Sequence, residues 1–247
     1  MTATRGTAVV SGAAQGIGRT FAVALAAAGH DIAIIDTQPA DETAAAIASA
    51  GRGVIAHVAD ASDPVAVSAF GDAVRGRLPR VRVLVNNAGI SPYSPFPETT
   101  LDMWHQLLRV NLDSMFLITQ EFLPDLVSGD DGRIVNMTSS VVWDFQATNM
   151  TAYATTKAGI VGFTRALAGE VGHLGVTVNC IAPGIVLTPD IEDRVPAERL
   201  ETYRDRQAIK RLAVPEDLVP ALDFLVNERS GHITGTIVPV NGGRVVL

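Results

Sequence analysis

The sequence predicts an α/β protein in which helices cover both faces of a mostly parallel sheet. Short runs of β-branched residues recur along the 247 residues, and longer alanine-rich segments that suit helices separate them. Strands and helices that alternate in this way pair in parallel through right-handed crossovers. No repeat, low-complexity linker or block of charge marks a boundary. We therefore expect one doubly wound domain over residues 1–247 with a seven-stranded sheet.

The predicted strands are nearly continuous hydrophobic runs, which is the pattern of strands buried on both faces. They span Thr7–Val10, Ile32–Ile35, Val54–Val58, Val83–Val85, Arg133–Met137, Val176–Ile181 and Thr236–Val240. The predicted helices span Ile17–Ala28, Glu42–Ala50, Val65–Gly76, Leu101–Val127, Ala152–Gly172 and Glu216–Val226.

One segment interrupts the alternation of strands and helices. Residues Val186–Lys210 are rich in proline and in charges of both signs, and they contain no strand pattern. Two interpretations remain open for this segment. It is either a solvated surface helix or an insertion, around residues 186–210, that acts as a lid over a substrate pocket.

Composition narrows the classes of function. Hydrophobic residues make up 47% of the chain and charged residues 18%, which is typical of a compact globular protein. A net charge of -7 disfavours binding to nucleic acid or to an anionic membrane. No apolar stretch is long enough to span a bilayer, and no signal peptide is recognisable. These observations favour small-molecule chemistry without nucleic acid or membrane.

The cysteine and histidine content favours a cytoplasmic protein without a metal site. The single Cys180 cannot form an internal disulfide, which fits a reducing cytoplasm. The five histidines show no metal-ligand spacing, so we expect no bound metal.

A glycine-rich loop follows the first predicted strand and precedes the first predicted helix. Its glycines are Gly12, Gly16 and Gly18. A phosphate needs backbone N–H groups and a helix N-terminus close by, and glycines allow that approach. An αβ turn without a ligand is the alternative, but the strand and helix on either side favour a dinucleotide-binding, Rossmann-type loop.

Asp36 ends the second predicted strand, where a carboxylate can accept hydrogen bonds from the hydroxyls of the adenosine ribose. The same charge would repel a 2′-phosphate. Gln15 and Thr37 nearby are neutral, although Arg19 is close in the sequence. We therefore expect NAD in preference to NADP; a helix N-cap is the alternative role for Asp36.

Tyr153 and Lys157 are four residues apart in a predicted helix, so they share a face. A nearby ammonium stabilises a phenolate and makes tyrosine a usable acid or base near neutral pH. Taken alone, the spacing is more typical of an amphipathic surface pair than of a catalytic pair. Asn86-Asn87-Ala88-Gly89 after the fourth strand, Asn111 in the next helix and Ser139-Ser140 after the fifth strand favour the catalytic interpretation.

With these motifs the chain resembles the short-chain dehydrogenase/reductase family over essentially its full length. The resemblance implies a catalytic set of Ser140, Tyr153, Lys157 and Asn111, in which Ser140 lies thirteen residues before Tyr153. Tyr153 would transfer the proton and Ser140 would hydrogen-bond the substrate oxygen. Lys157 would hold the nicotinamide ribose and lower the pKa of the tyrosine, and Asn111 would bind a water of a proton relay.

The resemblance also implies the cofactor site and the assembly. Asp60 would meet the adenine, and we expect a homo-oligomer, either a dimer or a homotetramer. The expected cofactor-binding residues are Gly12, Gln15, Gly16, Ile17, Gly18, Asp36, Asp60, Ala61, Asn87, Ala88, Gly89, Tyr153, Lys157, Pro183, Gly184, Val186 and Thr188.

The substrate pocket is expected where the carboxyl ends of the strands meet. Tyr93, Trp143, Phe145 and Met150 suggest an apolar, partly aromatic pocket there, although each could instead pack in the core or against another subunit. We expect Ser140, Tyr153, Trp143 and Tyr93 to contact substrate. The sequence thus predicts an NAD-dependent alcohol dehydrogenase or ketone reductase that interconverts a hydrophobic, aromatic or alicyclic secondary alcohol and its ketone.

Two alternatives remain open. The first is a 3-oxoacyl-thioester reductase acting on acyl carrier protein or coenzyme A substrates, which would prefer NADPH and present a basic surface to its carrier. The second is a nicotinamide-binding sensor without turnover. The presence of the full proton-transfer set argues against a sensor.

Overall fold

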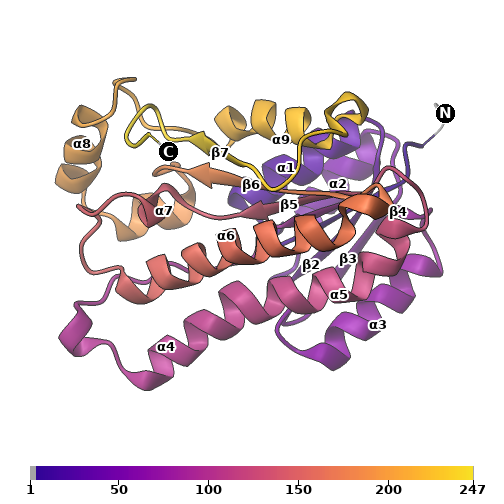
Figure 1. The fold of residues 1–247 in the computed structure, drawn as a ribbon, viewed down its shortest axis with the longest axis horizontal. Coiled ribbons are helices and arrows are strands. Elements are labelled where there is room, and N and C mark those ends of the chain that lie inside the picture. The colour runs from indigo at the N-terminus through magenta and orange to yellow at the C-terminus, as the bar shows by residue number, and fades with distance from the viewer. Residues whose placement is uncertain (1–3, 247) are drawn as a thin grey trace.

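The computed structural model describes residues 4–246, and it contains a seven-stranded, entirely parallel sheet (Figure 1). The strand order is β3-β2-β1-β4-β5-β6-β7. This confirms the predicted fold class, and the observed strand ends differ from the predicted ones by at most a few residues. The strands are β1 (Thr7–Ser11), β2 (Asp31–Asp36), β3 (Val54–Val58), β4 (Val81–Asn86), β5 (Arg133–Met137), β6 (Thr177–Pro183) and β7 (Ile237–Val240).

Helices cover both faces of this sheet (Figure 1). One face carries α1 (Gly16–Ala27), α2 (Asp41–Ser49) and α9 (Val219–Val226). The other carries α3 (Pro64–Arg75), α5 (Ser114–Val127) and α6 (Thr151–Val171), with α4 (Leu101–Leu108) leading into α5. Within residues 4–246, no helix has the length and apolar character needed to cross a membrane.

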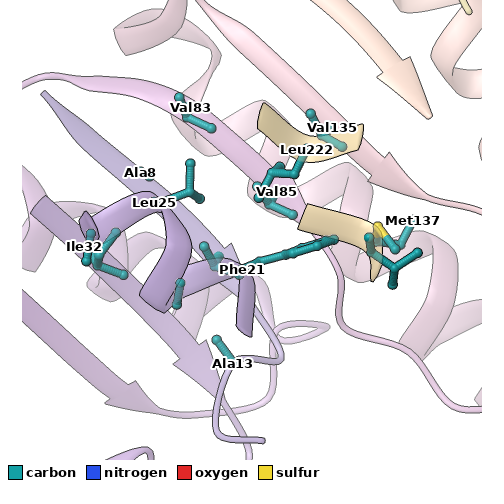
Figure 2. Packing of buried hydrophobic residues seen from close by; sticks show 14 of the residues in the cluster. Ala8, Ala13, Phe21, Leu25, Ile32, Val83, Val85, Val135, Met137 and Leu222 are labelled. Carbon is teal, nitrogen blue, oxygen red and sulfur yellow. The ribbon is translucent and has the colours of Figure 1, made fainter. Parts of the chain in front are cut away.

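Alternation along the strands divides the core into two layers. Ala8 and Val10 of β1 face the α1 side of the sheet, whereas Val9 faces the α5 side. Figure 2 shows the first layer, in which Phe21 of α1 and Leu222 of α9 pack over the strands. The residue types that made the strands recognisable are thus the ones that hold both helical layers to the sheet.

The order of the strands locates the cleft. Because β1 lies between β2 and β4, the chain winds away from β1 in both directions, and a crevice opens at the carboxyl ends of β1 and β4. Residues 186–210 lie at this end of the sheet, where they form α7 (Pro189–Arg194) and α8 (Ala197–Asp205) (Figure 1).

The predicted helix Leu101–Val127 is not uniform. A π-helical turn, Arg109–Asp113, separates α4 from α5. Turns of this kind carry one extra residue and occur frequently at functional sites. Hydrophobic periodicity cannot detect the turn, because the apolar positions continue on both sides of it.

Candidate active site

A cleft of about 800 Å³ opens at the carboxyl ends of the strands. Such a volume suits a bound cofactor or a substrate of moderate size. The glycine loop and Asp36 line one part of it, Tyr153 and Lys157 line the middle, and α7 and α8 line the remainder. Residues that are far apart in the sequence therefore line the same cleft.

The glycine loop is built for close approach. Gly12 and Gly16 have φ angles of +67° and +57°, which favour glycine. A Cβ on Gly18 would lie 2.0 Å from the carbonyl oxygen of Gly12, so α1 can pack on the loop only without a side chain there. The first turn of α1 contains no acidic residue, and no side chain caps its N–H groups. The loop therefore fits an anionic group such as a pyrophosphate.

Ser11 and Asn87 hold the loop in place. The Ser11 hydroxyl accepts hydrogen bonds from the backbone N–H groups of Asn87 and Ala88, at 3.1 Å each. The Asn87 side chain donates to the carbonyl oxygens of Ser11 and Gly12, at 3.1 and 2.9 Å. These contacts connect the carboxyl ends of β1 and β4, so Asn87 and Ala88 shape the cradle from its far side.

Asp36 lies at the end of β2 and faces the cleft. Its carboxylate accepts hydrogen bonds from the backbone N–H of Ala14 at 2.8 Å and of Gln38 at 2.9 Å. It caps no helix through its side chain, since α2 begins at Asp41 after Ala40. Each oxygen retains a lone pair that can accept a further hydrogen bond from a ribose hydroxyl.

The far end of the cleft is neutral or acidic. Asp60 accepts hydrogen bonds from the backbone N–H and the hydroxyl of Ser62, which hold the pKa of its carboxyl below the usual range. Arg19 is bound to Glu42 at 2.7 Å instead of facing Asp36. The cations among the described lining residues are Lys157, Arg194, Arg199, Arg206 and Arg244, and none belongs to the segments around Asp36 or Asp60.

Tyr153 and Lys157 extend from one face of α6 into the middle of the cleft. The Lys157 ammonium lies 5.6 Å from the centre of the Tyr153 ring and donates a hydrogen bond to the carbonyl oxygen of Met137 at 2.8 Å. Lys157 is buried, and burial lowers its pKa to about 8. Burial also raises the pKa of Tyr153 to about 12.

Two neighbouring serines, Ser139 and the expected Ser140, line the cleft together with Tyr153. The hydroxyl of Ser139 acts to lower the pKa of Tyr153, whereas Ser140 acts to lower the pKa of Tyr203, which burial raises. Neighbouring residues of an extended segment point to opposite sides, and Ser139 has extended backbone angles. Ser139 is therefore a second candidate for the serine role, beside the Ser140 that the resemblance implies.

Asn111 is buried in the π-helical turn between α4 and α5. Its side-chain oxygen accepts a hydrogen bond from the N–H of Ile90 at 2.8 Å, and its amide donates to the oxygen of Ile90 and the hydroxyl of Thr156. Asn111 thus connects the loop after β4 to α6. Its side chain fixes Ile90 and, through Thr156, the helix that bears Tyr153 and Lys157.

Most of the other expected residues also line the cleft. Gln15, Ile17, Ala61 and Gly89 border the cofactor portion. Pro183, Gly184, Val186 and Thr188 follow β6, and a Cβ on Gly16 would lie 3.4 Å from the methyl group of Thr188. Thr188 therefore lies against the start of α1 and borders the glycine cradle.

The expectation of an apolar, aromatic substrate side is only partly met. Tyr93 and Met150 line the cleft, but among residues 4–246 the lining does not include Trp143 or Phe145, and Phe145 is 94% exposed. Four arginines that were not predicted, Arg194, Arg199, Arg206 and Arg244, line this side together with Tyr203. For the first three, the basic residues within 186–210 were the available signal, but the six acidic residues of the same segment concealed it.

The fold, the glycine cradle and the Tyr153–Lys157 pair agree with the comparisons to known proteins. Residues 12–244 match a family model described as enoyl-(acyl carrier protein) reductase. The chain belongs to the short-chain dehydrogenase/reductase family of oxidoreductases, whose members use nicotinamide cofactors.

Curated relatives act on different substrates. The chain is 35% identical to the (2S)-[(R)-hydroxy(phenyl)methyl]succinyl-CoA dehydrogenase subunit of Thauera aromatica, covering 96% of this chain and 95% of the relative. It is 36% identical to a 3-oxoacyl-[acyl-carrier-protein] reductase of Aquifex aeolicus, with 95% of each chain covered. A cis-4-hydroxycyclohexanecarboxylate dehydrogenase of Sinomonas cyclohexanicum is 34% identical, over 96% of this chain and 95% of the relative.

Solved structures of similar proteins contain both forms of the cofactor. A protein from Agrobacterium tumefaciens with bound NADP has a TM-score of 0.88 and 33% identity, covering 98% of this chain and 96% of the other. A 3-oxoacyl-[acyl-carrier protein] reductase from Brucella melitensis with bound NAD has a TM-score of 0.89 and 30% identity, covering 98% and 92%.

Proposed function

We propose that this protein is an NAD(H)-dependent oxidoreductase that interconverts a secondary alcohol with an alicyclic or aromatic body and its ketone. The observation that carries the proposal is the position of Tyr153. The Lys157 ammonium lies over its ring at 5.6 Å, Ser139 acts on the pKa of its phenol, and the same cleft contains the glycine cradle and Asp36. A proton-transfer group and a dinucleotide site thus border the same space.

The roles of the residues follow from this arrangement. NAD, when bound, supplies the acceptor for the hydride that leaves the carbinol carbon. Tyr153 takes the hydroxyl proton in oxidation and returns it in reduction. Ser139 holds the reacting oxygen by a hydrogen bond, because its hydroxyl lies beside the same phenol. Lys157 binds the nicotinamide ribose, and Asn111 holds the water of the proposed relay.

The charges near Asp36 support NAD over NADP. A 2′-phosphate would meet the Asp36 carboxylate, and Arg19 in the first turn of α1 is paired with Glu42. No lysine or arginine in the described cleft lining flanks Asp36 or Asp60. An uncompensated phosphate at this position would be repelled, whereas ribose hydroxyls can donate to the carboxylate.

The 3-oxoacyl-thioester reductase remains the second candidate, favoured by the similarity to the Aquifex aeolicus enzyme. A sensor without turnover receives no support from a cleft that contains Tyr153, Ser139 and Lys157 together.

We also keep a cytoplasmic location, assembly into a dimer or tetramer and a lid function for residues 186–210 as proposals. The exposed Phe116 of α5 suits an interface between copies of the chain.

A substrate panel tests the reaction class. Secondary alcohols and ketones with alicyclic or aromatic bodies, and 3-oxoacyl thioesters, are assayed with both NAD and NADP forms by following the absorbance of the reduced cofactor. We expect turnover of alcohols with NAD. Turnover confined to thioesters with NADPH would favour the second candidate, and a strong general preference for NADP would contradict the role of Asp36.

A pair of alanine variants tests the assignment of the serine. Ser139→Ala removes the hydroxyl beside Tyr153, so we expect kcat/KM to fall about 100-fold or more, as for loss of a group that binds the reacting oxygen. Ser140→Ala is the matched control, because its hydroxyl lies beside Tyr203, and we expect a fall of less than tenfold. The reverse order of effects would restore Ser140 to the catalytic position.

A further inference from the structure

The geometry points to a substrate that carries a carboxylate as well as the alcohol, with the carboxylate bound by Arg199 and Arg206 beneath α8. This inference rests on the proposed function and names the substrate class of that same site. It extends the description of the substrate from a hydrophobic alcohol to a hydroxy acid whose apolar body separates the two groups.

Four arginines line the substrate side of the cleft, and only two of them have acidic partners. Arg194 is bound to Asp190 and also donates to the carbonyl oxygen and the hydroxyl of Ser91, at 3.2 and 3.3 Å. Arg244 is bound to Asp144 at 2.8 Å, and the side chains of both are 9% exposed. In each pair the two charges cancel, and the pair fixes the arginine side chain in the lining of the cleft.

Arg199 and Arg206 have no such partner. Within residues 4–246, neither guanidinium lies within ion-pair distance of a carboxylate. Arg199 stacks on Tyr93, with its guanidinium carbon 4.1 Å from the ring centre, and Arg206 donates to the side-chain oxygen of Gln146 at 2.7 Å. The substrate side therefore carries two uncompensated positive charges on a chain whose net charge is -7.

The position of these charges indicates what they bind. Tyr93 and Tyr153 line the same cleft and Arg199 stacks on Tyr93, so its guanidinium lies beside the tyrosines of the cleft. Stacking on Tyr93 orients the planar guanidinium, which then offers paired N–H donors in the geometry that a carboxylate accepts. The apolar side chain of Met150 also lines the cleft and suits a hydrocarbon body.

The test compares matched acids and neutral analogues. Hydroxycyclohexane carboxylates of different substitution and their methyl esters are assayed with NAD, and the ratio of kcat/KM for acid over ester is determined. We expect the wild-type protein to prefer the acid. In the double variant Arg199→Met/Arg206→Met, the ratio should fall about 10- to 100-fold, through KM more than kcat, because charge-assisted hydrogen bonds are lost. Arg204→Met is the control, since Arg204 is on the same helix but does not line the cleft.

A binding measurement separates this inference from the reaction class. Cyclohexanecarboxylate and cyclohexanecarboxamide, which have no hydroxyl to oxidise, are titrated by calorimetry into the protein with NADH. The carboxylate site is supported if the protein binds the acid but not the amide, and if acid binding is lost in the double variant and kept in Arg204→Met. If these results are obtained and no alcohol is oxidised, the carboxylate site stands and only the proposed reaction fails. Equal binding of acid and amide, or an unchanged acid preference in the double variant, would overturn the inference.

Discussion

Tyr153 stands in surroundings that act on its pKa in opposite directions. Burial raises the pKa to about 12, with a smaller increase from Tyr93, while Ser139 and Arg194 act to lower it. Lys157 is itself buried and its pKa falls to about 8. The protonated phenol is therefore the dominant form near neutral pH, which suits donation of a proton to a ketone oxygen.

This balance predicts different pH responses for the two directions of reaction. Oxidation requires the phenolate, and a pKa raised above 10 leaves only a small fraction of it at pH 7. We therefore expect kcat/KM for alcohol oxidation to rise between pH 6.5 and 9.5, by up to about tenfold per unit. Reduction, which uses the protonated phenol, should not rise. Initial rates in both directions at constant ionic strength provide the measurement; oxidation that is flat while reduction rises would contradict the role of Tyr153.

The residue types at the site could be predicted from the sequence, but not all of their partners. Tyr153, Lys157 and Asn111 line or support the cleft because helical spacing and motif position constrain them strongly. Ser139 and Ser140 are adjacent and chemically identical, so only the backbone direction after β5 decides which hydroxyl meets Tyr153. The arginines of α8 are separated in sequence from Tyr93 by about a hundred residues, and no local pattern links them.

Two helices set the geometry of the site. The N-terminus of α1 presents uncapped N–H groups to the cradle, and the π-helical turn before α5 turns Asn111 toward the loop after β4 and toward α6. The first feature could be predicted from the glycine spacing. The second could not, because an extra residue within a helix leaves the apolar pattern on both sides almost unchanged.

Gly18 tests the packing of α1 against the loop. The Cβ of Gly18→Ala would lie 2.0 Å from the Gly12 oxygen, so the loop must shift. We expect NADH to bind at least tenfold more weakly and the free energy of unfolding to fall by about 1–3 kcal/mol, as in overpacked sites. NADH fluorescence titration and urea unfolding provide the two measurements.

Gly169→Ala is the matched control for this substitution. Gly169 lies within α6, and a Cβ there meets no atom within 4 Å. Replacing glycine by alanine in a helix stabilises it, so we expect a gain of about 0.5–1 kcal/mol with unchanged NADH affinity. Wild-type stability and affinity in Gly18→Ala would show that the loop does not hold the cofactor as proposed.

At the scale of the whole molecule, the cleft has two ends of different charge. Asp36 and Asp60 lie at the cofactor end, and the uncompensated Arg199 and Arg206 lie at the substrate end. The net charge of -7 hides this separation. The sheet order, which follows from alternating strand and helix patterns, could be predicted; the distribution of charge within the cleft depends on tertiary contacts and could not.

The acidic cofactor end predicts how ligands stabilise the protein. A ligand at 100 times its Kd adds about 2.7 kcal/mol to the stability of the folded state. For a chain of this size, that corresponds to a rise in Tm of roughly 5–10 °C. NADH should reach this rise, and NADPH at the same concentration should produce a smaller one because Asp36 repels its 2′-phosphate. Asp36→Ala should narrow the difference; an equal or larger effect of NADPH on the wild-type protein would contradict NAD preference.

Tyr153→Phe shows whether the protein is a dehydrogenase in which Tyr153 transfers the proton. The variant removes only the phenolic oxygen, so NADH should bind with an affinity within about threefold of wild type. Secondary-alcohol oxidation measured by NADH absorbance should fall by about 10²- to 10⁴-fold, the usual contribution of a proton-transfer group. Oxidation at the wild-type rate, with NADH still bound, would show that Tyr153 does not transfer the proton.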